Sequence, residues 1–197
     1  MTFILASSSP FRAELLSKAG LTFTTDAATI DERVVEAPLI KSGLDAADVA
    51  AVLAEAKALD VAARHPGGLV LGADQTMALD GQLRHKPANM EEARFRLLAM
   101  SGKVHTLHSA LALVRDGETL WRHTSTAHMY VRPLSPPFIG RYLAEISDSA
   151  LQSVGAYQIE GAGIRLFERI EGDHFAIIGM PMLPLLSELR RMGLIDG

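Results

Sequence analysis

The stretch FILASSSPFRAELL, residues 3–16, decides the fold that we expect at the start of the chain. Its three leading apolar residues suit a buried strand, and three serines and Pro10 come soon after them. Proline fits the first position of a helix, where its missing N–H costs nothing. We therefore expect a helix from Pro10 to about Gly20, with Ser9 as its N-cap. Serine hydroxyls and free backbone N–H groups at a helix start predict an anion site.

Arg12 lies in the first turn of this helix and supports the prediction of an anion site. A positive charge at that end opposes the helix dipole, so we expect a negative group close to it. The alternative is an ordinary capped helix whose arginine is solvated.

The composition of the 197-residue chain limits the classes of protein that it can belong to. Hydrophobic residues make up 48% of it, which indicates a globular protein with one sizeable core. The net charge of −4 argues against a general nucleic-acid binder, which would carry a basic excess. The absence of cysteine excludes disulfides and thiolate metal sites. No stretch has transmembrane length and no secretory signal is recognisable, so we expect a cytoplasmic protein without a membrane partner.

Strand patterns and helix patterns alternate along the chain, and we expect an α/β fold with a mixed sheet, in one compact unit (residues 1–197) with two lobes. The expected strands cover residues 69–73, 104–114, 119–131 and 161–172, and the expected helices cover 45–64, 89–101, 136–146 and 181–192. Two Asp-Gly pairs, Asp80-Gly81 and Asp116-Gly117, predict two-residue hairpin turns.

The segment Gly72-Ala73-Asp74-Gln75-Thr76 places an acid at the expected carboxyl end of a buried strand. This is the usual place for a ligand-facing group in α/β proteins, and the two small residues before the acid leave room for a ligand to approach. Asp74 therefore suits a role in binding a divalent cation or holding an attacking water. The alternative is that Asp74 caps the next turn.

Other charged residues stand at positions that we interpret as loops, apart from Lys57, which belongs to the alanine-rich helix. Asp31-Glu32 follows the run that ends at Ile30, and Lys86 precedes a proline. Each of them alone is more simply a solvated charge. Together with Asp74 and Arg12 they supply acids for a metal and cations for phosphate, which suits metal-assisted chemistry on a polyphosphate.

Many short segments of this chain occur in an order that resembles a known family. They are Leu5–Arg12 with Leu15-Leu16, Asp31-Glu32, Lys57, Gly72–Asp74, Lys86-Pro87, Glu92-Ala93, Ser101-Gly102 with His105, Gly155–Tyr157 and Gly179–Pro181. This pattern resembles the Maf-like nucleoside triphosphate pyrophosphatases over essentially the whole chain. The resemblance implies an elongated mixed α/β fold with a cleft between two lobes, related to inosine triphosphate pyrophosphatases. It also implies hydrolysis of a nucleoside triphosphate to the monophosphate and pyrophosphate with a divalent cation, Mg²⁺ or Mn²⁺, and a homodimer.

The resemblance assigns roles to individual residues. It implies that a phosphate-binding loop contains Ser7, Ser9 and Arg12. It implies that Glu32 and Asp74 serve the metal and the attacking water, with Asp74 as the proton acceptor. It also implies that Lys57 and Lys86 neutralise phosphate charge and that Gln75 and Glu160 bind the rest of the substrate.

Two positions favour one branch of the family. Asp74-Gln75 and Glu160-Gly161 resemble the branch that acts on 7-methyl-GTP, whereas the branch that acts on dTTP and UTP usually carries Asp-Thr and Gln there. A carboxylate at Glu160 can accept hydrogen bonds from the N–H groups of guanine. The alternatives are a dTTP- or UTP-type pyrophosphatase, and a non-catalytic nucleotide-binding regulator of septum formation.

Overall fold

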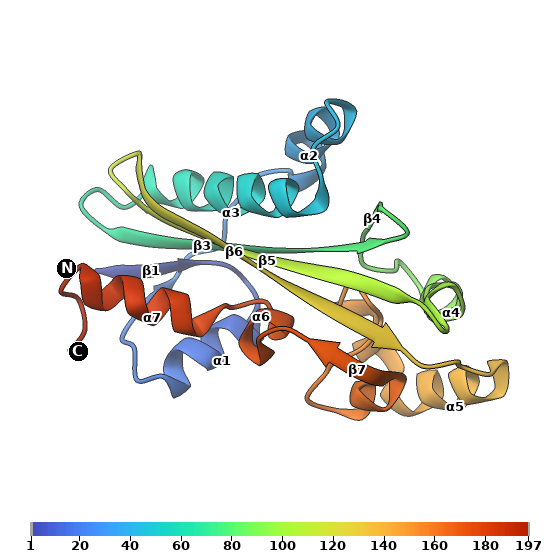
Figure 1. Cartoon of the computed structure of the whole chain (residues 1–197). Coiled ribbons are helices and arrows are strands. Elements are labelled where there is room, and N and C mark those ends of the chain that lie inside the picture. The colour runs from blue at the N-terminus through green and yellow to red at the C-terminus, as the bar shows by residue number, and fades with distance from the viewer. Residues whose placement is uncertain (1, 197) are drawn as a thin grey trace. The chain divides into compact units, whose positions relative to one another are not determined.

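The computed structural model describes residues 2–196, drawn in Figure 1. Its strands form a seven-stranded sheet in the order β2-β1-β3-β5-β6-β7, with β4 paired to β3. The strands are β1 (Phe3–Ala6), β2 (Thr24–Thr25), β3 (Leu69–Leu79), β4 (Gln82–Arg84), β5 (Val104–Arg115), β6 (Glu118–Val131) and β7 (Phe167–Glu171). The pairs β1–β2 and β1–β3 are parallel, and β3–β4 and β6–β7 are antiparallel. The predicted α/β fold with a mixed sheet is confirmed.

The helices lie between these strands in the chain. They are α1 (Pro10–Lys18), α2 (Glu32–Lys41), α3 (Ala46–Ala62), α4 (Met90–Met100), α5 (Pro136–Ile146), α6 (His174–Ile178) and α7 (Met182–Arg191), with 3₁₀ turns η1 (Ser147–Gln152) and η2 (Ala162–Leu166). The chain forms two compact units. The first unit takes in Met1–Gln75, His108–Ser125 and Asp173–Gly197, and the second takes in Thr76–Leu107 and Thr126–Gly172.

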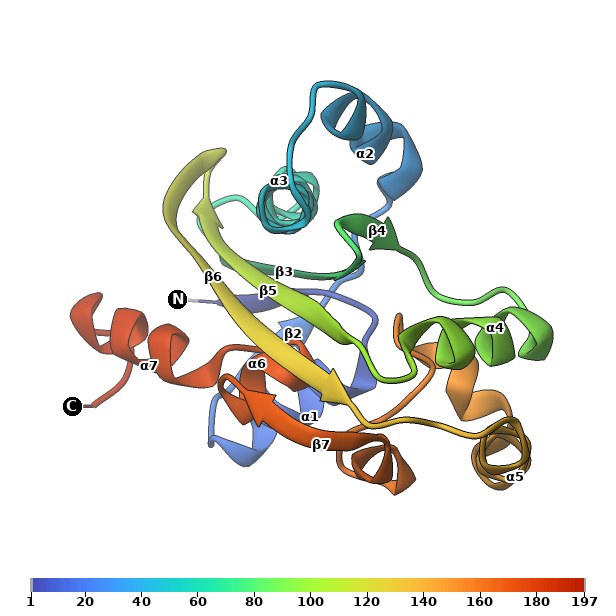
Figure 2. The same cartoon turned by 45° about the vertical axis from the view of Figure 1, so that its right-hand side comes forward.

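The first unit has helices on both faces of its strands, as Figure 1 shows. On one face α3, which Figure 2 shows end-on, packs against β1, β3 and β5 through small and β-branched residues. On the other face α1 and α7 cover larger side chains. The alternation of β1 sets this division, because Ile4 and Ala6 join the α3 side and Leu5 joins the other.

The predicted hairpin turn of the second unit is present, and its helix α4 begins with a capped N-terminus. Asp80 and Gly81 have φ of 54° and 72°, as a two-residue hairpin turn requires. Asn89 caps α4 by accepting from the backbone N–H of Glu92 at 2.9 Å. The Glu92 carboxylate in turn accepts from the backbone N–H of Ala88 at 2.9 Å, so the cap is reciprocal. Helix α4 packs against α5 and η1.

The predicted strand over residues 161–172 is wrong in its first half. Residues Ala162–Leu166 form the 3₁₀ turn η2, and the strand β7 begins only at Phe167. Gly163 in this segment explains the difference. Gly163 lies so close to the backbone of Gln158 that a Cβ there would come within 2.4 Å of its carbonyl oxygen, so this part of the chain folds back on itself.

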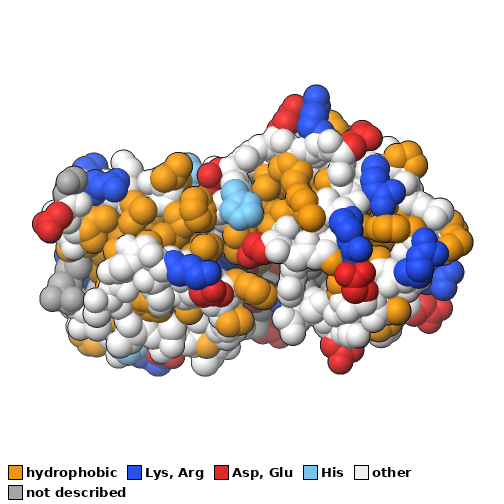
Figure 3. Space-filling model, turned by 90° about the horizontal axis from the view of Figure 1, so that it is seen from below, with side chains coloured by type: hydrophobic (Ala, Val, Ile, Leu, Met, Phe, Trp, Pro, Cys, Tyr) orange, Lys and Arg blue, Asp and Glu red, His pale blue; other side chains and the backbone are white. Residues whose placement is uncertain are grey.

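Charged side chains of both signs are interspersed with hydrophobic ones on the face that Figure 3 shows. This distribution matches a chain with 19 lysines and arginines and 23 acidic residues. Within residues 2–196, no helix combines the length and the apolar character needed to cross a membrane.

His105 lies buried in an aromatic cluster of the second unit. It is 1% exposed, and its Nε2 lies 2.8 Å from the hydroxyl of Tyr157. Phe167 packs against both rings, with its centroid 4.8 Å from that of Tyr157 and 6.0 Å from that of His105. Burial, with a smaller contribution from the charge of Arg96, lowers the pKa of His105 from 6.5 to about 4.

The low pKa of His105 predicts that acid destabilises the protein. Between pH 6.5 and pH 4 the unfolded chain binds a proton at this position and the folded chain does not, so stability is complete above pH 6.5 and falls as the pH drops towards 4. The expected loss is on the order of 3 kcal/mol. His105→Gln, which does not titrate, should flatten the dependence of the urea midpoint on pH in this range. An equal slope in His105→Gln and in the unmodified protein would contradict the prediction.

Candidate active site

Two carboxylates of the first unit converge on one ammonium group. The Nζ of Lys57 lies 2.6 Å from Oε1 of Glu32 and 2.6 Å from Oδ1 of Asp74. The Lys57 and Asp74 side chains are 12% and 9% exposed, whereas that of Glu32 is 53% exposed. The three residues come from α3, α2 and β3, so the fold brings together two acids and a lysine that the sequence predicted as one site.

Asp74 lies inside β3 and not at its carboxyl end, so that part of the prediction is wrong. The polar residues Asp74–Thr76 do not end the strand, because the turn comes only at Asp80. The parallel pairing with β1 does stop nearby, since its last pair is Ala6 with Gly72. Asp74 therefore lies two residues beyond Gly72, the last residue of β3 that pairs with β1. The serine loop, which we define as Ser7–Ser9, follows directly after β1.

The role expected for Gly72 is also corrected. A Cβ on this residue would lie 2.0 Å from the carbonyl oxygen of Ala54 and 2.8 Å from the Cβ of Ala58, so α3 fills the space that we expected a ligand to use. The glycine allows the helix to approach β3 closely. This contact places Lys57, the neighbour of Ala58, beside Asp74.

Arg12 belongs to the same part of the first unit. Its guanidinium donates to the carbonyls of Ala73 at 2.8 Å and Gly179 at 3.1 Å and to Oγ of Ser7 at 3.2 Å. Burial lowers the pKa of Arg12, while the charges of Asp74 and Glu32 oppose this effect. These two acids are the negative groups that the position of Arg12 in the helix predicted.

The serine loop is held by Ser7. Its Oγ accepts from Arg12 and, at 3.2 Å, from the backbone N–H of Ser9. Because this oxygen accepts both bonds, its own O–H can donate to a ligand. Ser9 is the N-cap of α1 as predicted, but its side chain makes no capping hydrogen bond.

Asp31-Glu32 begins a helix, so the loop predicted there is wrong. The Asp31 carboxylate accepts from the backbone N–H groups of Arg33 at 2.9 Å and Val34 at 3.3 Å and thereby caps α2. Glu32 is the first residue of that helix. The β-branched pair Val34-Val35 and the internal Pro38 weaken the helical pattern in the sequence and conceal the cap.

Glu36 is an acid near this cluster that the sequence analysis did not select. It follows Glu32 by one turn of α2 and is 7% exposed. Burial raises the pKa of Glu36, the charge of Arg33 lowers it, and the charges of Asp74 and Glu32 raise it further. The signal in the sequence was the spacing of four residues between two acids after a capping Asp31.

The side chain of Gln75 points its amide nitrogen at the protein. Nε2 lies 2.9 Å from Oγ of Ser109, 3.1 Å from the carbonyl of Ala176 and 2.9 Å from that of Ile177. Gln75 thus connects β3 to α6, and its carbonyl oxygen is the atom that it can offer to a ligand.

Lys86 and Glu160, the two remaining predicted site residues, belong to the second unit and are exposed. The side chain of Arg96 on α4 donates to the carbonyl of His85 at 3.0 Å and to the carbonyl of Val154. Arg96 therefore joins the loop that carries Lys86 to the segment that leads to Glu160.

The donor set of Glu32 and Asp74 fits Mg²⁺ or Mn²⁺. Both ions prefer carboxylate oxygens, and Mg²⁺ is usually bound through one or two carboxylates together with phosphate oxygens and water. Two carboxylate oxygens already lie at 2.6 Å from a single cationic atom. No group of three or more His, Cys, Asp or Glu side chains that could hold a metal ion occurs in residues 2–196.

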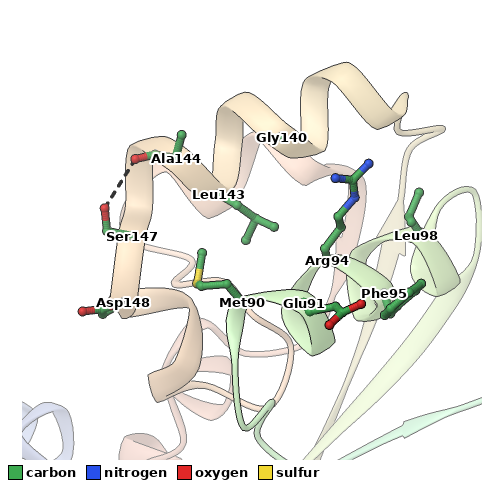
Figure 4. Close-up of a pocket in the computed structure, with 10 residues that line it drawn as sticks. All are labelled: Met90, Glu91, Arg94, Phe95, Leu98, Gly140, Leu143, Ala144, Ser147 and Asp148. Atoms are coloured by element: carbon green, nitrogen blue, oxygen red, sulfur yellow. Dashed lines mark hydrogen bonds between the residues drawn. The ribbon is translucent and has the colours of Figure 1, made fainter.

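The second unit also contains a surface hollow between α4 and α5, of about 790 Å³. Figure 4 shows the side chains of Met90 and Leu143 facing each other across it. The charged residues on its wall are Glu91, Arg94 and Asp148, and none of the predicted site residues lines it. The converging carboxylates of the first unit are therefore the better candidate for catalysis.

The profile of the Maf-like protein family matches residues 2–192. The chain belongs to this family. A relative from Brucella suis biovar 1, named 7-methyl-GTP pyrophosphatase, is 59% identical over 194 residues, which cover 98% of either chain. A relative of the same name from Mesorhizobium japonicum is 60% identical over 194 residues, again 98% of either chain. Among solved structures, a dITP/XTP pyrophosphatase from Mycobacterium abscessus matches with a TM-score of 0.44 and 15% identity, over 98% of this chain and 94% of that one.

Proposed function

We propose that this chain is a nucleoside triphosphate pyrophosphatase that hydrolyses 7-methyl-GTP or a similar modified nucleotide to its monophosphate and pyrophosphate, and so removes non-standard nucleotides. The observation that carries the reaction type is the pair of carboxylates, Glu32 and Asp74, on the Nζ of Lys57. The full-length relatives that bear the name 7-methyl-GTP pyrophosphatase support the choice of substrate.

The proposed reaction is attack by water on the α-phosphorus. The water oxygen forms a bond to phosphorus, the bond from that phosphorus to the α–β bridging oxygen breaks, and pyrophosphate leaves. Asp74 accepts the proton of the water, the role that the family resemblance implies for this carboxylate. Lys57 and Arg12 in the first unit and Lys86 in the second supply positive charge for the phosphates.

The remaining predicted residues bind and orient the substrate in this proposal. Ser7 and Ser9 bind phosphate oxygens through hydroxyl and backbone N–H groups at the start of α1. Gln75 presents its carbonyl oxygen, because its amide nitrogen is bonded to the protein. Glu160 recognises the base by accepting hydrogen bonds from its N–H groups.

The cofactor, the assembly and the location are also part of the proposal. Glu32 and Asp74 would hold Mg²⁺ or Mn²⁺, an ion that offsets the charge of a triphosphate when it is bound. The family resemblance supports a homodimer. A cytoplasmic location, which the sequence analysis expects, would give the enzyme access to nucleoside triphosphates.

A panel of nucleotides tests this proposal. Purified protein is incubated with 7-methyl-GTP, GTP, UTP or dTTP and with Mg²⁺ or Mn²⁺, and pyrophosphate and orthophosphate are measured separately without added pyrophosphatase. We expect pyrophosphate as the product and the highest kcat/KM for 7-methyl-GTP. Release of orthophosphate alone would rule out the reaction type, a preference for UTP or dTTP would indicate the other branch, and binding without turnover would indicate a regulator.

Glu160→Gln tests how the base is read. Guanine presents adjacent N–H donors to a carboxylate, whereas uracil and thymine present one N–H between two carbonyl acceptors, which repel it. Losing one charged acceptor should lower the ratio of kcat/KM for 7-methyl-GTP over UTP by about tenfold or more. An unchanged ratio with equal losses for all substrates would show that Glu160 does not read the base.

A further inference from the structure

Glu32 is the least secured member of the candidate site. Its side chain is 53% exposed, whereas Asp74 is held inside β3 and Lys57 lies within α3. The chain reaches Glu32 through the segment of residues 26–31, which follows β2. Six residues can span up to about 20 Å, so the covalent chain alone leaves Glu32 free to move by many ångströms.

Two residues of α3 and one residue of the turn that follows it lie along that segment and bind it. Lys57 and Asp60 are three residues apart on one face of α3, and Arg64 follows in the turn, where its guanidinium donates back to Asp60 at 2.8 Å. We name these three residues the α3 polar stripe. Lys57 binds Glu32 itself. The other two members bind residues of the segment before Glu32. The two stretches of chain run in opposite directions, so the later member of the stripe binds the earlier part of the segment.

Asp60 holds the middle of the segment. Its Oδ2 accepts from the backbone N–H of Thr29 at 2.9 Å and from Nη1 of Arg64 at 2.8 Å. The bond from Arg64, followed by that from the Thr29 backbone, lowers the pKa of Asp60, so the group is ionised at neutral pH. The hydroxyl of Thr29 adds a longer contact of 3.3 Å to Oδ1.

Arg64 holds the start of the segment. Its Nε donates to Oδ2 of Asp26 at 3.1 Å, and its Nη2 donates to the carbonyl of Ala27 at 3.0 Å. The carboxylate of Asp26 also lies 2.8 Å from Nε2 of His65. A single guanidinium thus bonds to Asp26, Ala27 and Asp60, which is the planar, many-donor geometry in which arginine differs from lysine.

We propose that Asp60 and Arg64 are positioning residues of the active site, which fix residues 26–31 along α3 and thereby keep Glu32 beside Lys57 and Asp74. The inference rests on the proposed function, because it takes Glu32 as a metal ligand. Groups behind a metal ligand commonly change metal affinity by ten- to a hundredfold when they are removed. The α3 polar stripe therefore sets the affinity of the site for the divalent cation without touching that cation.

The test measures Mn²⁺ binding to the full chain by titration calorimetry, without nucleotide. Asp60→Ala should weaken Mn²⁺ binding about tenfold. Asp60→Asn keeps an oxygen that can accept from Thr29 and should show a smaller loss, and it also serves if the alanine variant does not fold. Arg64→Ala should weaken binding in the same direction.

The matched control is Glu55→Ala on the same helix. Glu55 is 21% exposed and Asp60 23%, and Glu55 likewise has two partners, Thr119 at 2.5 Å and Arg122. Its partners belong to β6 and not to residues 26–31. Glu55→Ala should therefore leave the Mn²⁺ affinity unchanged even where it lowers the thermal midpoint as much as Asp60→Ala does.

A double-mutant cycle with Glu32→Gln decides whether Asp60 acts through Glu32. Glu32→Gln alone should weaken Mn²⁺ binding, and adding Asp60→Ala should then cause no further loss. A full additional loss, or an Asp60→Ala variant that binds Mn²⁺ as the Glu55→Ala control does, overturns the positioning role and leaves the site assignment intact. Unchanged binding in Glu32→Gln overturns the site assignment itself.

Discussion

Asp74→Asn is expected to lower kcat for 7-methyl-GTP by about a hundredfold or more, because the amide cannot accept the proton of the attacking water. The substitution keeps the shape of the side chain. Lys57 retains its ion pair with Glu32 at 2.6 Å, so the folded state keeps most of its contacts around this lysine. Kinetics with 7-methyl-GTP and circular dichroism melting measure the two effects separately.

Asp80→Asn is the matched control for this variant. It makes the same chemical change in the turn directly after β3, at a residue with φ of 54°, a conformation that asparagine also adopts readily. The exposed pair of Asp80 with Lys103 contributes little stability. Asp80→Asn should keep the turnover of the unmodified protein. Near-normal turnover in Asp74→Asn as well would reduce Asp74 to a structural residue of β3.

The start of α1 and the two hairpin turns show what local sequence signals can predict. Pro10 and the serines before it marked the start of α1 correctly, and the two Asp-Gly pairs marked the hairpin turns correctly, because these residues act within a few positions of themselves. Asp31 failed as a local signal, since Val34-Val35 and Pro38 made the helix after it look irregular.

The contacts that build the site depend on the tertiary fold. The sequence pointed to Glu32, Lys57 and Asp74 as charged residues of one site, but it did not indicate that a single ammonium group bridges both acids. The bridge depends on the close approach of α3 to β3 that Gly72 allows. This role of Gly72 cannot be recognised until α3 is seen to lie against β3. The contacts of Asp60 were hidden for the same reason, since they join residues far apart in the chain.

The bridging lysine leads to a second large expected effect, this time on stability. Lys57→Met removes the ammonium but keeps the length of the side chain, and so it leaves the carboxylate of Asp74, 6% exposed, next to that of Glu32. Removing one partner of a buried ion pair typically costs about 3 kcal/mol or more, because the other charge stays buried without compensation. Urea unfolding at pH 7 in the absence of divalent cations should show this loss.

Lys103→Met is the control, because Lys103 forms an ion pair of the same length that is exposed to solvent and not buried. The Nζ of Lys103 lies 2.6 Å from Oδ2 of Asp80, as close as Lys57 lies to its partners, but the two side chains are 47% and 56% exposed. Exposed pairs contribute between 0 and about 1 kcal/mol, so Lys103→Met should change the free energy of unfolding by less than about 1 kcal/mol. Equal losses in the two variants would mean that burial does not matter at Lys57.

Two further measurements identify the source of the loss in Lys57→Met. The double variant Lys57→Met/Asp74→Asn should recover much of the stability, because it removes the buried charge that the single change leaves unpaired. Millimolar Mn²⁺ should raise the thermal midpoint of Lys57→Met more than that of the unmodified protein, because in the proposed site a dication held by Glu32 and Asp74 would compensate for the lost ammonium charge. If neither the second substitution nor Mn²⁺ restores stability, the loss comes from packing around Lys57 and not from the repulsion of two carboxylates.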